Sequence, residues 1–195
     1  MAARGGEQRF LRALSGCRKV NLDTNPVVYY LGGGEPYGTL MRALFGLVNR
    51  GSLEVVISRI VQMELLVKPI RERNLDAVDE VIHFTERTPN VRVVDVFRHV
   101  VVQAAFVRAD SLDIRDEGRD EDKAADGRRC KEGGLVVPDC LVVATGVVTQ
   151  CDATITNDRR WRRTLERLDL RPPMARGPEF LNLPPTLYLH EYVDD

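Results

Sequence analysis

The 195-residue sequence has few cysteines and histidines, no long apolar run and no excess of either charge. Its four cysteines form no CxxC pair and are not close in sequence to the three histidines, which disfavours a zinc site; we expect reduced thiols in a cytoplasmic protein. No apolar run reaches the roughly eighteen residues of a membrane span, and residues 1–19 lack the apolar segment of a secretory signal. Lys and Arg total 28 against 29 Asp and Glu, so nucleic-acid binding requires a local basic patch.

The apolar pattern predicts strands that alternate with helices. Strands are expected at residues 19–23, 53–58, 91–96, 152–156 and 187–193. Connections of more than about a dozen residues between them indicate mostly parallel pairing, with helices on both faces of the sheet. The predicted fold class is therefore α/β.

The chain length predicts one domain. Residues 1–18 are expected to form a polar extension, and residues 19–195 the main domain. A helix from about Phe97 is expected to end near Arg108, and a charged, mobile insertion is predicted at about 110–134. Pro69 is expected to end another helix.

Four acidic residues stand where predicted strands end or on otherwise apolar helices. Asp23 follows the first strand, and Asp158 follows the strand that ends at Thr156. Asp139 lies in the first turn of a helix, and Glu64 lies on an apolar helix. Sites in parallel sheets form at the carboxyl ends of the strands. Because converging buried carboxylates repel one another, we expect a divalent cation among them, and Mg²⁺ or Mn²⁺ suits such oxygen ligands.

Each acid also has a local interpretation. Asp139 alone is typical of a helix cap, Asp23 and Asp158 of turn residues, and Glu64 of a solvent-facing helix position. The joint placement of the four favours the shared metal site. Asp152 precedes its strand and is expected at the opposite end, where a turn role is favoured.

Three stretches carry these acids in a fixed order. They are VNLDTNPVVYYL (residues 20–31), ISRIVQMELLVKP (residues 57–69) and VPDCLVVATGVVTQCDATITNDRRW (residues 137–161). In these stretches and their spacing, from about residue 19 onward, the sequence resembles the PIN domain family, and within it the VapC-like toxin ribonucleases. The third stretch is the most specific. The insertion at 110–134 and the first 18 residues depart from the family pattern.

The resemblance implies a three-layer α/β/α sandwich around a mostly parallel sheet and a hydrolase that cuts single-stranded RNA. It implies Mg²⁺ or Mn²⁺ held directly by Asp23 and Asp139, and directly or through water by Glu64 and Asp158. Hydrogen-bond donors that hold these carboxylates in place are then expected among the neighbouring polar side chains, namely Thr24, Asn25, Thr156 and Asn157. A toxin of this kind implies a small antitoxin protein as partner and a homodimer, for which the helices within 26–48 are one candidate surface.

A basic segment directly follows the last acid. Its members are Arg159, Arg160, Trp161, Arg162 and Arg163. They suit phosphate pairing and base stacking in an RNA substrate. An equally supported interpretation is a solvated helix whose tryptophan packs on the core. For a second group, Lys68, Arg71 and Arg73, a solvent-exposed role is favoured.

Two other functions compete with the toxin ribonuclease. One is a PIN-fold module that binds RNA or protein without cleavage, and the presence of all four acids argues against it. The other is a non-toxin PIN nuclease in RNA processing, which the absence of a neighbouring antitoxin gene would favour.

Overall fold

The computed structural model describes residues 2–122, 135–170 and 183–193. The elements in chain order are α1 (Ala2–Ala13), β1 (Lys19–Leu22), α2 (Thr24–Gly32), α3 (Tyr37–Asn49), β2 (Glu54–Ser58), α4 (Arg59–Arg71), α5 (Leu75–Arg87), β3 (Val91–Val94), α6 (Arg98–Asp122), α7 (Val137–Val148), β4 (Ala153–Thr156), α8 (Arg160–Leu170), β5 (Thr186–Tyr188) and the 3-10 helix η2 (Leu189–Tyr192). None of the described helices has the length and apolar character needed to cross a membrane.

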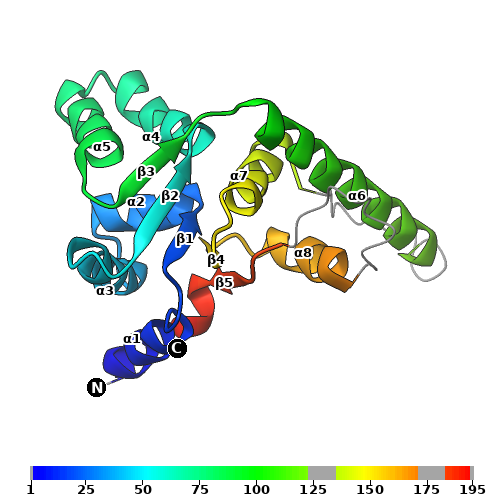
Figure 1. Ribbon diagram of the computed structural model, residues 1–195, viewed down its shortest axis with the longest axis horizontal. Coiled ribbons are helices and arrows are strands. Elements are labelled where there is room, and N and C mark those ends of the chain that lie inside the picture. The colour runs from blue at the N-terminus through cyan, green and yellow to red at the C-terminus, as the bar shows by residue number, and fades with distance from the viewer. Residues whose placement is uncertain (1, 123–134, 171–182, 194–195) are drawn as a thin grey trace.

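The five strands of the described residues form one parallel sheet in the order β3-β2-β1-β4-β5. Helices α2 to α5 lie on one side of this sheet, and α6 to α8 lie on the other (Figure 1). The central strands β1, β2 and β4 are buried along almost their whole length, as is typical of strands covered on both faces. The predicted α/β/α sandwich with a parallel sheet is confirmed.

Helix α7 packs closely on β1 and β4 because Gly146 has no side chain. A Cβ atom there would lie 3.0 Å from both Asn21 Nδ2 and Thr154 Oγ1. Asn21 Nδ2 also donates to the carbonyl of Val142 on α7 at 3.0 Å. This approach holds the first turn of α7, which carries Asp139, beside the sheet.

The first helix contributes to the core, although residues 1–18 were expected to be a polar extension. Phe10 is fully buried and Leu14 is buried. The Phe10 ring contacts that of Tyr192 on η2, with 5.2 Å between ring centroids. The N-terminal segment therefore packs against the last described element of the chain.

Three predicted boundaries were wrong. Helix α6 does not end near Arg108 but continues to Asp122, because a helix that has already formed and packs on α7 can be extended without a new nucleation step. Residues 123–134, the rest of the predicted insertion, lie outside the described residues. Pro69 does not end α4, which continues to Arg71: the proline removes one N–H of the helix, but the following Glu72 and Asn74 N–H groups donate to the carbonyls of Lys68 and Pro69, both at 3.0 Å. The strand predicted at 187–193 is only Thr186–Tyr188, and η2 then turns Leu189 into the core.

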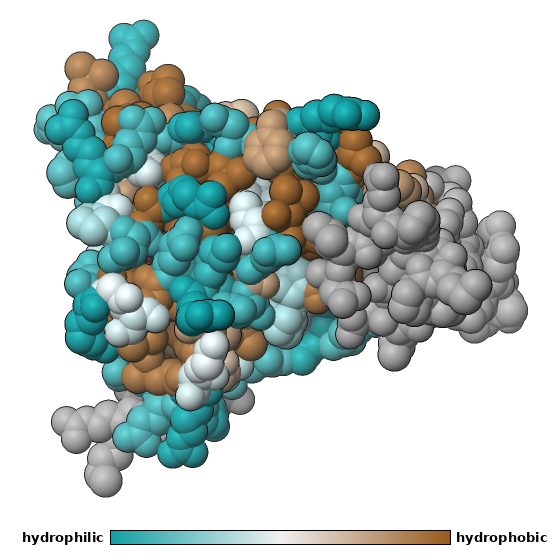
Figure 2. Space-filling view, in the orientation of Figure 1, coloured by the Kyte–Doolittle hydropathy of each residue, from teal (hydrophilic) through white to brown (hydrophobic). Residues whose placement is uncertain are grey.

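The helices proposed for self-association use their apolar residues inside the fold. Val27 on α2 and Leu40, Met41 and Leu44 on α3 are almost fully buried. Side chains that remain exposed, such as Val28, are scattered. Figure 2 shows instead apolar residues among hydrophilic ones over α4 and the start of α6.

Candidate active site

The acids gather where the chain changes direction in the sheet. From β1 the chain builds β2 and β3 on one side, and later β4 and β5 on the other, so β1 and β4 are neighbours at the switch point. Leu22 pairs with Ile155, and the Asp23 N–H donates to the Ile155 carbonyl at 3.0 Å. The residues that follow β1 and β4 are thereby held side by side at the carboxyl edge.

Asp23 occupies the centre of this edge. It precedes the first turn of α2 in an extended conformation, but its side chain does not cap that helix. Its Oδ2 instead accepts a hydrogen bond from Thr156 Oγ1 at 2.7 Å, and Thr156 Oγ1 accepts from the Asp158 N–H at 3.0 Å. One threonine at the end of β4 thus connects Asp23 to the segment that carries Asp158.

Burial raises the pKa of Asp23 to about 6, and the residue is only 6% exposed. The hydrogen bonds from Thr156 and from the Thr24 backbone oppose this rise, and the charges of Asp139 and Glu64 add to it. Asp23 is therefore a buried carboxylate in the field of two other acids, and a cation beside it would relieve both desolvation and repulsion.

Helices α4 and α7 bring the second and third acids. Glu64 is half-buried on α4, and the Thr24 hydroxyl donates a hydrogen bond to its Oε2. Asp139 is half-buried in the first turn of α7. Burial raises the pKa of Asp139 and the charge of Asp158 raises it further, whereas Arg160 and the nearby Trp161 indole lower it. The indole Nε1 nevertheless does not reach hydrogen-bonding geometry with any described partner.

Asp158 differs from the other three acids because it has a basic partner. Arg160 Nε donates to its Oδ1 and Oδ2, both at 2.9 Å, and the Arg160 N–H donates to Oδ1 at 2.9 Å. Burial alone would raise the pKa of Asp158, but these hydrogen bonds and the charge of Arg160 lower it. In the described residues, Asp23, Glu64 and Asp139 form no ion pair with a basic side chain.

The four acids fit a hard divalent cation in chemistry, but they do not form a closed shell. The described residues contain no group of three His, Cys, Asp or Glu side chains already arranged around a metal position. Hydrogen bonds link three of the acids: Thr156 joins Asp23 to the Asp158 backbone, and Thr24, the residue after Asp23, binds Glu64. The charge of Asp139 acts on Asp23, and that of Asp158 acts on Asp139. Carboxylate oxygens with water completing the shell are the ligands that Mg²⁺ uses in proteins.

The two predicted asparagines lie differently. Asn157 donates through Nδ2 to the Tyr29 hydroxyl at 3.0 Å, and its Oδ1 is buried without a hydrogen-bond partner in the described residues. Asn25 is exposed on α2 and makes no hydrogen bond to a described acid. Tyr29 is a supporting residue that the sequence analysis missed, because no pattern relates a helix tyrosine to a loop 128 residues away.

The residues of the basic segment, Arg159 and the first turn of α8, have different surroundings. Trp161 is 1% exposed, so the structure favours the core-packing interpretation over base stacking. Arg162 is bound to Glu166 and Glu191 and lies 5.2 Å from the centre of the Tyr188 ring. Arg159 is exposed and has no ion pair among the described residues. The side chain of Arg163 lies outside the described part.

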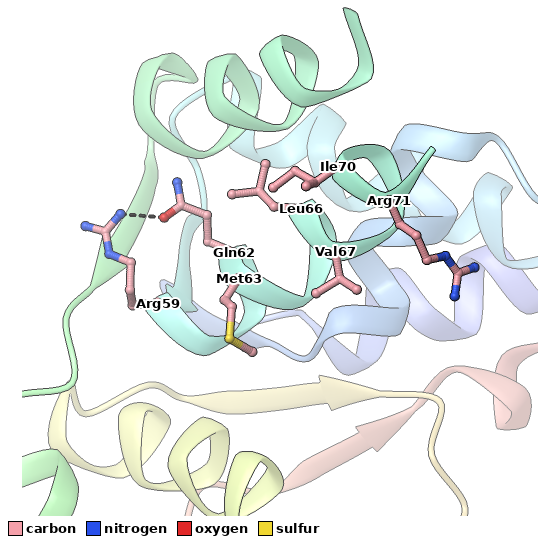
Figure 3. A pocket seen from close by; sticks show the side chains of 7 residues that line it. All are labelled: Arg59, Gln62, Met63, Leu66, Val67, Ile70 and Arg71. Carbon is pink, nitrogen blue, oxygen red and sulfur yellow. Dashed lines mark hydrogen bonds between the residues drawn. The ribbon is translucent and has the colours of Figure 1, made fainter. Parts of the chain in front are cut away.

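An open apolar groove runs along α4, the helix that carries Glu64. It encloses about 480 Å³ and is lined by Arg59, Gln62, Met63, Leu66, Val67, Ile70 and Arg71 (Figure 3). Arg59 donates to Gln62 Oε1 at 2.5 Å at one end of the groove.

Lys68, Arg71 and Arg73 are exposed, as the solvent-facing interpretation predicted.

Asp152 lies at the other end of β4 from the cluster. Its Oδ2 accepts from the backbone N–H groups of Arg18 at 2.7 Å and Lys19 at 2.9 Å. These hydrogen bonds lower its pKa. The predicted position of Asp152 at the opposite end of the strand is confirmed, but its side chain binds the distant start of β1 and not a local turn.

The fold and this edge together define a class: a parallel α/β/α protein with four carboxylates at its switch point. Residues 20–166 match the PIN domain, and the chain belongs to the PIN domain family, whose members are generally nucleases. Each of the four acids lies within the matched range.

Solved structures share the fold at low sequence identity. The DNA-bound VapBC of Salmonella typhimurium aligns with a TM-score of 0.53 at 17% identity, over 89% of this chain and 98% of that one. VapBC-1 of nontypeable Haemophilus influenzae aligns with a TM-score of 0.51 at 13% identity, over 88% of this chain and 98% of that one. FitAcB of Neisseria gonorrhoeae aligns with a TM-score of 0.51 at 17% identity, over 76% of this chain and 93% of that one. The comparison with curated proteins gives no significant sequence match.

Proposed function

We propose that this chain is a metal-dependent endoribonuclease that hydrolyses phosphodiester bonds of single-stranded RNA and acts as the toxin of a toxin–antitoxin pair. One observation supports the proposal: hydrogen bonds and mutual charge effects link four acids from four separate segments near the carboxyl ends of β1 and β4, and three of these acids have no basic partner among the described residues. Such an arrangement is unfavourable unless a cation joins it.

In the proposed site, Asp23 and Asp139 hold Mg²⁺ or Mn²⁺ directly, and Glu64 and Asp158 hold it directly or through water. A bound ion of this kind lowers the pKa of its water and neutralises charge on the phosphate. Thr156 orients Asp23, and Thr24 orients Glu64, each through its hydroxyl. These hydrogen bonds keep the carboxylates in place for the ion.

The RNA must approach a cluster of negative charge, so basic groups are needed at the rim. Arg159 suits this role because it is exposed, directly follows Asp158 and has no ion pair among the described residues. An arginine so placed pairs well with phosphate oxygens of a flexible strand. Arg162 is less suited, since two glutamates already engage it.

The proposed antitoxin would cover the cluster with an apolar segment. Exposed apolar side chains flank the acids: Met63 precedes Glu64 and is 50% exposed, and Val136 and Val137 precede Asp139 and are 51% and 59% exposed. The α4 groove continues this surface away from Glu64. The fold shared with the VapBC structures supports a partner of this kind. Self-association remains a further proposal, and exposed Val101 and Val102 on α6 are the better candidates for it.

A cleavage assay on labelled single-stranded RNA tests the proposal. The purified chain should cleave this RNA in the presence of Mg²⁺ or Mn²⁺ and lose the activity in chelator. The Asp139→Asn variant should cleave it about a hundredfold or more slowly. Asp152→Asn is the matched control, because that acid lies at the opposite end of β4, and it should retain activity. Double-stranded RNA and single-stranded DNA of the same sequence test the substrate class.

Two results would contradict the enzyme assignment. Cleavage that survives chelator or Asp139→Asn comes from another source. Absence of both cleavage and Mn²⁺ binding by calorimetry leaves a PIN-fold module that binds without cutting. The toxin role fails separately if induced expression of the wild type slows growth no more than expression of Asp139→Asn.

A further inference from the structure

A guanidinium already neutralises one of the four acids. Arg160, the first residue of α8, engages both carboxylate oxygens of Asp158 through Nε at 2.9 Å, and its Nη2 also contacts Oδ2. The Asp158 side chain is only 12% exposed, whereas that of Arg160 is 82% exposed. The carboxylate is thus set into the site, and the cation covers it from the solvent side.

The charge of Arg160 extends over the rest of the cluster. The hydrogen bonds to Asp158 raise the pKa of Arg160 most, and the charges of Asp139 and Asp23 raise it further. The same guanidinium lowers the pKa of Asp139. Among the described residues, this is the one ion pair that includes a member of the cluster. Arg160 is therefore placed where a bound cation would also act.

Resting on the metal-dependent function above, we propose that Arg160 is a built-in counterion of the acid cluster, which a divalent cation must displace from Asp158 in order to bind. A carboxylate whose two oxygens are held by a guanidinium has less electron density to offer a metal, and two cations in one site repel each other. Release of Arg160 is inexpensive because its side chain is exposed and gives up little packing. The residue therefore sets the affinity of the site for metal without preventing its occupation.

Calorimetric titration of the metal-free chain with Mn²⁺ tests this inference. Arg160→Gln should bind Mn²⁺ about twofold to tenfold more tightly than the wild type, the range expected when an exposed ion pair and one like charge are removed. Arg159→Gln is the matched control, because it removes the same charge from the adjacent residue, which has no ion pair in the described part. It should change the affinity by less than about twofold.

A second measurement follows Arg160 itself. Its Nε–H resonance, assigned by its loss in Arg160→Gln, should move when diamagnetic Mg²⁺ is added, while that of Arg159 stays in place. Three results would each overturn the counterion role and leave the nuclease proposal intact. The first is equal Mn²⁺ affinity in Arg160→Gln and the wild type, and the second is an equal gain of Mn²⁺ affinity in Arg159→Gln. The third is an Arg160 Nε–H resonance that does not move when Mg²⁺ binds. If neither the wild type nor any variant binds Mn²⁺, the proposed function itself is wrong.

Discussion

Replacement of Asp23 by asparagine should stabilise the metal-free chain at neutral to alkaline pH. Burial raises the pKa of Asp23 from 3.8 to about 6, so the folded state favours the protonated acid. The stability that this group contributes is complete below pH 3.8 and is lost as the pH rises through about 6. A rise of this size corresponds to about 3 kcal/mol of lost folding free energy above pH 7.

Asparagine removes the charge and keeps an oxygen that can accept from the Thr156 hydroxyl. We therefore expect Asp23→Asn to gain about 1–3 kcal/mol near pH 8 in chelator, and about 2 kcal/mol less than that near pH 4.5. Urea denaturation at the two pH values measures both differences. The change in the mutational effect with pH isolates the ionisation of Asp23 from the titration of other groups.

Asp152→Asn is a control of opposite sign. Two backbone N–H groups lower the pKa of Asp152, so its contribution to stability is present above the ordinary carboxyl pKa and is lost as the pH falls. This variant should be less stable than the wild type near pH 8. The reasoning is refuted if Asp23→Asn is less stable than the wild type near pH 8, or if its effect does not depend on pH.

Three further substitutions test the packing and the support of the site. Phe10→Ala should cost about 3–5 kcal/mol of unfolding free energy in urea, because the ring is fully buried. Gly146→Ala should cost about 1–3 kcal/mol in the same measurement, because the new Cβ would lie 3.0 Å from polar atoms of β1 and β4. Thr156→Val should weaken Mn²⁺ binding about tenfold or more by calorimetry, because Asp23 loses the hydroxyl that orients it.

Each of these has a matched control in the chain. Leu75→Ala, at a residue 74% exposed, should change stability by less than about 0.5 kcal/mol. Gly46→Ala on α3 meets only a flexible arginine end at 3.6 Å and should be neutral or stabilising. Thr149→Val removes a hydroxyl that binds the α7 backbone at 2.7 Å and should leave Mn²⁺ affinity unchanged. Equal effects in a substitution and its control would contradict the structural reason given for it.

The positions of three acids were predictable from the sequence because the ends of two strands and the start of one helix are visible in it. Asp23 and Asp158 follow short apolar runs, and parallel strands bring their carboxyl ends to one edge. Asp139 stands in the first turn of an apolar helix whose second residue is a proline. Glu64 was assigned to the site from its apolar sequence neighbours. This is weaker evidence, because the periodicity of α4 does not indicate which face of the helix meets the sheet.

The remaining features depend on contacts between distant parts of the chain. The sequence after β4 contains several arginines but does not give their side-chain conformations. It therefore did not distinguish Arg160, which binds Asp158, from Arg159, which has no ion pair in the described residues. Composition alone made residues 1–18 look polar, because only a few apolar side chains are needed for α1 to dock, and Phe10 is one of them. The predicted end of α6 is too early because a charged composition was taken to indicate disorder, whereas a helix that has already formed can extend through such residues without a new nucleation step.

The hydrogen bond between Thr156 and Asp23 spans 133 positions of the sequence, and this has a consequence during synthesis. β1, β2 and β3 leave the ribosome first, whereas β4 can pair with β1 only after Thr156 has emerged. Any nascent or truncated product that stops earlier keeps one side of β1 open and lacks Asp158. Translation thereby delays assembly of the complete acid set until most of the polypeptide has been made.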